Sequence, residues 1–138
     1  MSNFYNIKIK DNILNFIILL ALVFIASFLI ATWMKTYFKV PRPCIGLPGC
    51  PTSYSFPSRH AVVIFALVTA IALQQRDYRI NILLFLFAIV ISAYRLFIVV
   101  HRPVDIVVGA IIGFIIGYLS KPLYKFYQKN LYYKLKFK

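Results

Sequence analysis

Residues 13–34 read ILNFIILLALVFIASFLIATWM, an apolar run broken only by scattered small or polar side chains. At 1.5 Å per residue, a helix of this length spans about 33 Å, which is enough to cross the hydrocarbon core of a bilayer. The rest of the chain has the same character, because 62% of its 138 residues are hydrophobic and only 14% are charged. A soluble domain of this size could not bury so much apolar surface. We therefore expect an integral membrane protein.

Three further apolar segments follow, at residues 58–75, 80–100 and 104–120, and a basic tail occupies residues 121–138. A proline-rich loop that cannot be helical separates the first two segments. The fourth segment has three small residues on one face, namely Gly109, Gly113 and Gly117. Small residues at this spacing permit the close approach of another helix. The tail fits either a helix end with interfacial aromatics or an amphipathic helix on anionic lipid. The pattern predicts one all-α domain over residues 1–138, an integral membrane bundle of about four transmembrane helices.

The charge of the chain is strongly positive, with sixteen Lys and Arg against three acids and a net charge of +13. In a soluble protein this balance would suggest nucleic acid as a partner. Here the cations lie at the ends of apolar runs, where anionic lipid headgroups explain them better, so we expect no nucleic-acid partner. The first run is too long for the core of a signal peptide, and no small-residue cleavage site follows it, so we expect no cleavable signal.

The distribution of the cations predicts the orientation. With the N-terminus, the 74–79 link and the tail in the cytoplasm, ten basic residues lie inside: Lys8, Lys10, Arg76, Arg79, Lys121, Lys125, Lys129, Lys134, Lys136 and Lys138. Six lie outside: Lys35, Lys39, Arg42, Arg59, Arg95 and Arg102. The positive-inside rule therefore places both termini in the cytoplasm of a multi-pass protein of the cell membrane.

The six outward cations share their segments with both histidines and with Asp105. Any one of them could be a simple interfacial anchor. Arg95 is placed one to two turns inside the end of its apolar segment, where an ionisable residue is costly and is a functional candidate. Several cations with two histidines and one carboxylate indicate a site for a multiply charged anion such as phosphate. The chain offers no carboxylate cluster that would hold magnesium, so we expect no metal and no cofactor.

Two pairs of residues have a spacing that suits this chemistry. Ser58 and His60 begin a helix after Pro57, and a first helical turn favours an anion, although Ser58 also fits a plain N-cap. His101 and Asp105 are four residues apart, so a helix would place both on one face. A carboxylate on one imidazole nitrogen leaves the other nitrogen free to attack or to take a proton. The alternative is an interfacial histidine beside an acid.

Three stretches in this region resemble known motifs. The first is Lys35, six residues, then Arg42-Pro43; the second is Pro57-Ser58-Arg59-His60; the third is Tyr94-Arg95, five residues, His101, three residues, Asp105. In this order and spacing they resemble the signature motifs of the type 2 phosphatidic acid phosphatase superfamily. Each motif alone is weak, but three of them in order on one side of a helical membrane protein are specific.

The resemblance implies a role for each matching residue. His101 would attack phosphorus and form a phosphohistidine, Asp105 would orient it, and His60 would protonate the leaving oxygen and later activate water. The phosphoryl oxygens would be held by Lys35, Arg42, Ser58, Arg59 (through nearby backbone N–H) and Arg95. Cations would then supply the positioning and charge neutralisation that phosphoryl transfer requires, without a metal.

The sequence also departs from the family pattern in three places. Arg59 replaces the usual glycine of the second motif, where it could serve a diphosphate or only face the headgroups, and Tyr94 replaces the usual serine of the third. Membrane members generally have six helices, whereas four apolar segments are found here. The pair expected before the first motif would be replaced by lipid or by a second copy of the chain in a homo-oligomer.

The expected function is hydrolysis of a membrane lipid phosphate or diphosphate, with undecaprenyl pyrophosphate as the first choice because the site faces outward and residues 55–61 look like bacterial polyprenyl diphosphate phosphatases. The alternatives are a glycerophospholipid phosphatase, a lipid phosphotransferase and, in another class, a non-catalytic lipid-binding protein. The sequence fits a Cys44–Cys50 disulfide and two free thiols equally well.

Overall fold

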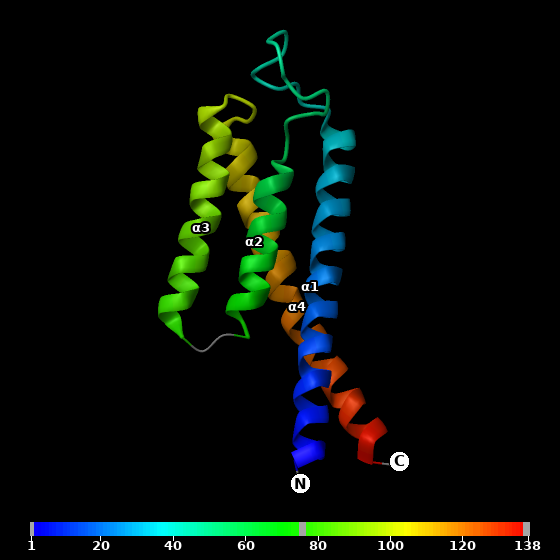
Figure 1. Ribbon diagram of the computed structural model, residues 1–138. Helices are drawn as coiled ribbons and strands as arrows, with labels where there is room; N and C mark the ends of the chain where they lie inside the picture. The colour runs from blue at the N-terminus through cyan, green and yellow to red at the C-terminus, as the bar shows by residue number, and fades with distance from the viewer. Residues whose placement is uncertain (1, 75–76, 137–138) are drawn as a thin grey trace.

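The computed structural model describes residues 2–74 and 77–136, with side chains over 13–74 and 77–126. The described residues form helices and loops, with no strand, and the helices are α1 (Ser2–Phe38), α2 (Arg59–Ala72), α3 (Tyr78–Phe97) and α4 (Pro103–Lys136). This confirms the predicted all-α bundle. In Figure 1, the 39–58 loop and the α3–α4 turn lie at one end of the bundle, and both chain termini lie at the other.

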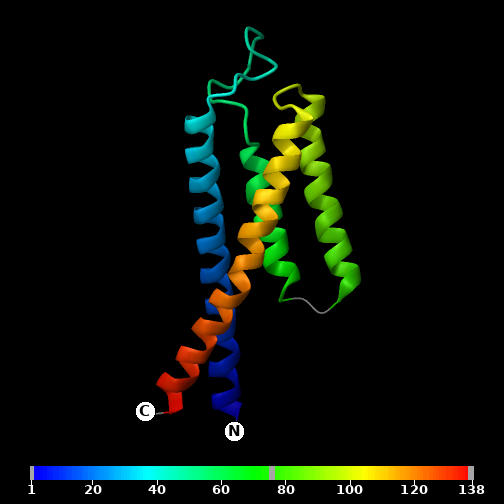
Figure 2. The same ribbon diagram turned by 180° about the vertical axis from the view of Figure 1, so that it is seen from behind.

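The short helix α2 is the centre of the bundle. It packs against α1, α3 and α4, most extensively against α4, whereas α3 and α4 touch little. Figures 1 and 2 show α2 between α1 and α3, with α4 crossing behind it in the view of Figure 1. Its buried residues are small or β-branched, among them Ala61, Val62, Ala66 and Ala70, while large apolar side chains of α1, α3 and α4 point outward. That arrangement is the one expected for helices whose outer surface meets lipid.

The glycine face of α4 is the reason for its close packing on α2. A Cβ atom at Gly113 would lie 2.4 Å from the Val62 carbonyl oxygen, and one at Gly117 would lie 2.5 Å from that of Ala66. A Cβ at Gly109 would lie 2.9 Å from the carbonyl oxygen of Ser58. These distances leave no room for a side chain, so the predicted close approach is confirmed and α2 is the partner.

Three helices are long and apolar enough to cross a membrane within the described residues, namely Ile13–Phe38, Tyr78–Phe97 and Pro103–Phe126. The second predicted segment, 58–75, is shorter than expected, because α2 has 14 residues and spans about 21 Å. Helix α2 ends at Ala72, and Leu73 is its C-cap. Asp77 then starts α3, since its carboxylate accepts a 2.8 Å hydrogen bond from the Arg79 backbone N–H.

The ends of the last two helices also differ from the prediction. Helix α3 stops at Phe97 instead of residue 100. Just beyond this end, Val99 takes the left-handed conformation, with a φ of 56°. Arg95 therefore lies in the last turn of α3 and not one to two turns inside it. Helix α4 continues through Pro122 to Lys136, so most of the predicted basic tail is an extension of α4. Residues 137–138 lie outside the described residues.

Candidate active site

A cavity of about 160 Å³ opens at the end of the bundle where α1 stops and where α2 and α4 begin. Pro51, Ser53 and Val100 line it, together with six of the eight predicted site residues. These six are Lys35, Arg42, Arg59, His60, Arg95 and His101. The other two, Ser58 and Asp105, are buried and do not line the cavity. The exposed cations Lys39 and Arg102 also lie outside its lining. Three motifs that are distant in the sequence thus meet at one cavity.

His101 is held in the turn before α4 with its two ring nitrogens in different surroundings. Its Nδ1 lies 3.5 Å from Oδ2 of Asp105, and its Nε2 lies 3.4 Å from Nη1 of Arg42. Burial, together with the positive charges of Arg42 and Lys35, lowers the pKa of His101 from 6.5 to about 4, although Asp105 opposes the shift. The imidazole is therefore neutral at pH 7. With Nδ1 directed to the carboxylate, Nε2 is the atom available as a nucleophile.

The carboxylate of Asp105 is 1% exposed and is fixed by donors from two segments. Its Oδ2 accepts hydrogen bonds from the Arg102 backbone N–H, at 2.8 Å, and from the hydroxyl of Ser55. That hydroxyl also lies 3.5 Å from Nδ1 of His101. The second oxygen, Oδ1, has no hydrogen-bond partner in the described part of the chain. Asp105 thus depends on Ser55 for one of its few contacts.

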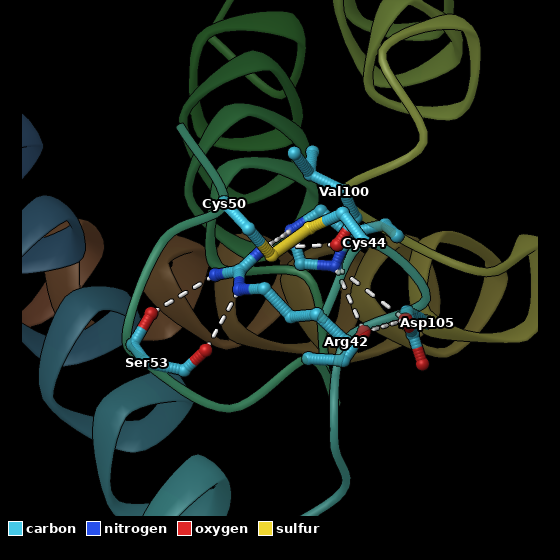
Figure 3. Close-up of a disulfide and its surroundings, with 8 residues drawn as sticks. Arg42, Cys44, Cys50, Ser53, Val100 and Asp105 are labelled. Carbon is cyan, nitrogen blue, oxygen red and sulfur yellow. Dashed lines mark hydrogen bonds and ion pairs between the residues drawn. A yellow bond between two sulfur atoms is a disulfide. The ribbon is translucent and has the colours of Figure 1, made fainter. Parts of the chain in front are cut away.

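Arg42 reaches from the proline-rich loop to the turn that carries His101 (Figure 3). Its Nε and Nη2 donate to the carbonyl and hydroxyl oxygens of Ser53, at 2.7 and 2.9 Å, and its Nη1 donates to the Val100 carbonyl at 2.9 Å. A disulfide joins Cys44 and Cys50 beside it, so the two thiols that the sequence left undecided are paired. The disulfide closes the part of the loop between Arg42 and Ser53.

Lys35 lies in the last turn of α1 and is 4% exposed. Its Nζ donates to the carbonyl oxygens of Tyr54 and Ser55, at 2.7 and 2.9 Å. The first motif therefore fixes the loop that precedes α2, in addition to placing a positive charge at the cavity. An ammonium group has three donors, so one remains for a phosphoryl oxygen.

His60 faces the cavity from the first turn of α2 and is exposed. The Arg95 guanidinium lies against its ring, with Nη2 2.8 Å from Nδ1 and also in contact with Nε2. These contacts join the second motif to the third across α2 and α3. The exposed position of His60, in contrast to buried His101, suits exchange of protons with a leaving group or with water.

Ser58 occupies the N-cap position of α2, which was the alternative that the sequence offered, but its side chain makes no capping bond. Its backbone N–H donates to the Asp105 carbonyl oxygen at 2.9 Å. The hydroxyl is fully buried and has no hydrogen-bond partner among the described residues. The structure therefore does not bring this hydroxyl to the cavity surface, and direct phosphate contact by Ser58 stays a prediction.

Two residues of the site were missed by the sequence reasoning. Ser55 contacts Asp105, and Ser53 contacts Arg42, yet both lie in a loop rich in polar residues where nothing in the spacing distinguishes them. Only their position three and five residues before Ser58 connects them with a motif.

As for a metal site, no group of three or more His, Cys, Asp or Glu side chains gathers in the described ranges, and metal independence stays a prediction.

An apolar groove of about 390 Å³ adjoins the polar cavity. Helices α1, α2 and α3 line it, with Phe24, Phe28, Val63, Ile64, Leu67 and Ile91. Arg59 and His60 line both the groove and the cavity, so the two spaces meet at the start of α2. A cationic cavity that continues into an apolar groove suits a molecule with an anionic head and a hydrocarbon tail.

Known proteins share both the sequence pattern and the fold. The chain is 28% identical over 108 residues to an undecaprenyl-diphosphatase from Sulfolobus acidocaldarius. The alignment covers 78% of this chain and 51% of that protein. This chain therefore spans about half the length of that curated relative.

Two solved structures are similar. A transmembrane PAP2 type phosphatidylglycerolphosphate phosphatase from Bacillus subtilis matches with a TM-score of 0.71 and 21% identity, over 89% of this chain and 69% of that one. Aquifex aeolicus LpxE matches with a TM-score of 0.63 and 32% identity, over 86% of this chain and 72% of that one. The model of the PAP2 superfamily matches residues 16–130, and this match includes every residue of the cavity. The chain is a membrane protein that belongs to the PAP2 superfamily.

Proposed function

We propose that this protein is a lipid phosphatase that hydrolyses a membrane lipid phosphate or diphosphate through a phosphohistidine on His101. The observation that carries the proposal is the environment of His101. It is a buried, neutral imidazole with Nδ1 directed to Asp105 and Nε2 to Arg42, at a cationic cavity that meets an apolar groove. Membership of the PAP2 superfamily supports the same activity.

The proposed reaction has two steps. Nε2 of His101 attacks phosphorus, and the bond from phosphorus to the lipid-side oxygen breaks. His60, in the protonated form that a bound anion favours, gives that oxygen a proton. Asp105 stabilises the positive charge that develops on His101, while the cations of the cavity neutralise the phosphoryl oxygens. Water then attacks the phosphohistidine, His60 takes a proton from it, and inorganic phosphate leaves. The 3.5 Å contact between His101 and Asp105 is expected to shorten as the charge forms.

Undecaprenyl pyrophosphate is our first choice of substrate. Its support is the likeness to an undecaprenyl-diphosphatase and an apolar groove next to the cavity. A glycerophospholipid phosphatase is the second candidate, favoured by the fold shared with a phosphatidylglycerolphosphate phosphatase. A lipid phosphotransferase would use the same residues and would differ in giving an acceptor-dependent product. A non-catalytic lipid binder would need the cations but not the paired His101 and Asp105.

We infer that both termini lie in the cytoplasm and that the cavity opens on the outer face of the cell membrane. The excess of Lys and Arg at the end that carries both termini supports this orientation. The Cys44–Cys50 disulfide supports it independently, because structural disulfides persist mainly outside the reducing cytoplasm.

Phosphate release by the protein purified in detergent tests the proposal. Undecaprenyl pyrophosphate and phosphatidic acid would be compared, with EDTA present throughout and with His101→Ala as the matched inactive variant. We expect release that resists EDTA and falls by at least roughly a thousand-fold in the variant, as expected for loss of a nucleophile. EDTA-sensitive release would overturn the metal-free mechanism, and no release from a folded protein would favour the binding-protein alternative.

A further inference from the structure

We propose that Arg59 binds the inner phosphate of a lipid diphosphate and makes the enzyme prefer lipid diphosphates to lipid monophosphates. The inference rests on the proposed phosphatase function and adds a substrate class and a residue that determines it. Arg59 stands where the superfamily motif usually has glycine, so the general mechanism does not require this side chain.

The first support is that the donors of Arg59 are uncommitted. Arg42 uses Nε, Nη1 and Nη2 on protein oxygens, and Lys35 uses its ammonium on two carbonyls. Arg59, in contrast, has no hydrogen-bond or ion-pair partner in the described part of the chain. Its guanidinium lies 4.7 Å from the centroid of the Phe28 ring, a cation–π contact that holds the group in place without using its N–H donors.

The second support is position. Arg59 and His60 are the two residues that line both the polar cavity and the apolar groove. When the terminal phosphate lies in the cavity beside His101 and the hydrocarbon tail lies in the groove, the group between phosphate and tail must pass Arg59. In a lipid diphosphate this group is the inner phosphate, whereas in a lipid monophosphate it is only the ester oxygen and the first carbons.

The chemistry gives this position a consequence for rate. Attack of His101 on the terminal phosphorus of a diphosphate forms the N–P bond and breaks the bond to the bridging oxygen. The electron pair moves onto that oxygen, so the leaving lipid monophosphate gains negative charge until His60 protonates it. A guanidinium at the inner phosphate neutralises this charge as it develops, with two parallel N–H donors available. A monophosphate substrate presents no second phosphate for Arg59 to bind.

Farnesyl diphosphate and farnesyl monophosphate test the inference, because they share one tail and differ only in the inner phosphate. The readout is kcat/KM for each, with the lipid product identified by chromatography, for the wild type, Arg59→Gln, Arg59→Gly and Arg59→Lys. Lys39→Gln is the matched control, because it removes one exposed cation from the same end of the molecule but outside the cavity.

We expect the ratio of diphosphate to monophosphate kcat/KM to fall by roughly ten-fold or more in Arg59→Gln and Arg59→Gly, which is the effect of losing one charge-assisted hydrogen bond. Arg59→Lys should lie between these variants and the wild type, and Lys39→Gln should keep the wild-type ratio. An unchanged ratio in Arg59→Gln and Arg59→Gly, or a wild type that prefers the monophosphate, would overturn the role of Arg59 and leave the phosphatase function standing. A wild type that acts on neither lipid would overturn the proposed function, and this inference with it.

Discussion

The hydroxyl of Ser55 donates a hydrogen bond to Oδ2 of Asp105, joining the loop before α2 to the first turn of α4. Both side chains are buried, and Ser55 is 0% exposed. The carbonyl oxygen of Ser55 accepts a hydrogen bond from Lys35, so one residue connects the first and third motifs. Ser55 is therefore a positioning residue that acts on His101 through Asp105.

Replacing Ser55 should slow catalysis without greatly weakening substrate binding. In Ser55→Ala, Oδ2 of Asp105 keeps the Arg102 backbone N–H but loses the Ser55 hydroxyl, and a hydrogen bond to a charged group contributes about 1.5–3 kcal/mol. We expect kcat to fall by roughly ten- to hundred-fold with KM little changed, as measured by phosphate release.

Ser27→Ala is the matched control for Ser55→Ala. Ser27 is also 0% exposed, but it bonds within α1 to the Phe24 carbonyl, outside the cavity. Ser55→Thr keeps the hydroxyl and should recover part of the rate. A rise in KM with kcat unchanged would argue that Ser55 acts on binding and not on Asp105.

The pH dependence of the reaction should reflect the low pKa of His101. A neutral imidazole is required for attack, and a folded-state pKa of about 4 keeps it neutral at every pH above that value. We therefore expect the acidic limb of kcat/KM that is due to His101 to lie well below the usual 6.5.

Arg42→Gln should move this limb to higher pH. Burial is the largest cause of the low pKa of His101 and remains in the variant, but the positive charge of Arg42 also disfavours the imidazolium, so its removal raises that pKa part of the way toward 6.5. The same variant should raise KM, because a cation of the phosphate cavity is lost. An NMR titration of the His101 ring in both proteins provides the direct comparison, and equal pKa values in the two would contradict the assigned cause.

Gly113→Ala should destabilise the bundle. A Cβ at this position would lie 2.4 Å from the Val62 carbonyl oxygen and 2.9 Å from the Phe65 Cβ, so α2 and α4 would have to separate. Overpacking of this kind costs about 1–3 kcal/mol, seen as a lower Tm in detergent. Ile111→Ala is the control, because Ile111 lies on the outer face of α4 and is 54% exposed. An equal Tm for Gly113→Ala and the wild type would show that the interface can adapt.

Removal of the disulfide should affect both stability and phosphate binding. A ring of this size is expected to contribute about 2 kcal/mol through the unfolded state. The ring also lies between Arg42 and its partner Ser53, so its loss frees the loop that holds the guanidinium. We expect the Cys44→Ser, Cys50→Ser double variant to show a lower Tm and a higher KM. A dithiol reductant should reproduce both effects in the wild type and leave the double variant unchanged.

Much of the site could be predicted because its residues occur in motifs with a chemical logic. His101 and Asp105 lie four residues apart at a helix start. His101 lies in the turn before α4 and Asp105 in the first turn of α4, and their side chains come within 3.5 Å of each other. The cations Lys35, Arg42 and Arg95 were assigned to one membrane face from the order of apolar segments alone, and all three line the cavity. The helix ends were predicted less well. Helix α3 ends at Phe97 although the apolar sequence continues, and α4 continues to Lys136 although the apolar sequence has already ended.

By itself, the sequence determined the apolar segments, the glycine face of α4 and the concentration of cations near both histidines, because these depend on composition and on short spacings. Tertiary structure alone decided the contacts between residues far apart in the chain, such as Ser55 with Asp105, 50 positions apart, and Arg42 with His101, 59 positions apart. It also decided that Arg59 lies where the cavity meets the groove. The physical reason is that hydrogen bonds act over about 3 Å, and only the packing of α2 among the other helices brings such atoms within that distance.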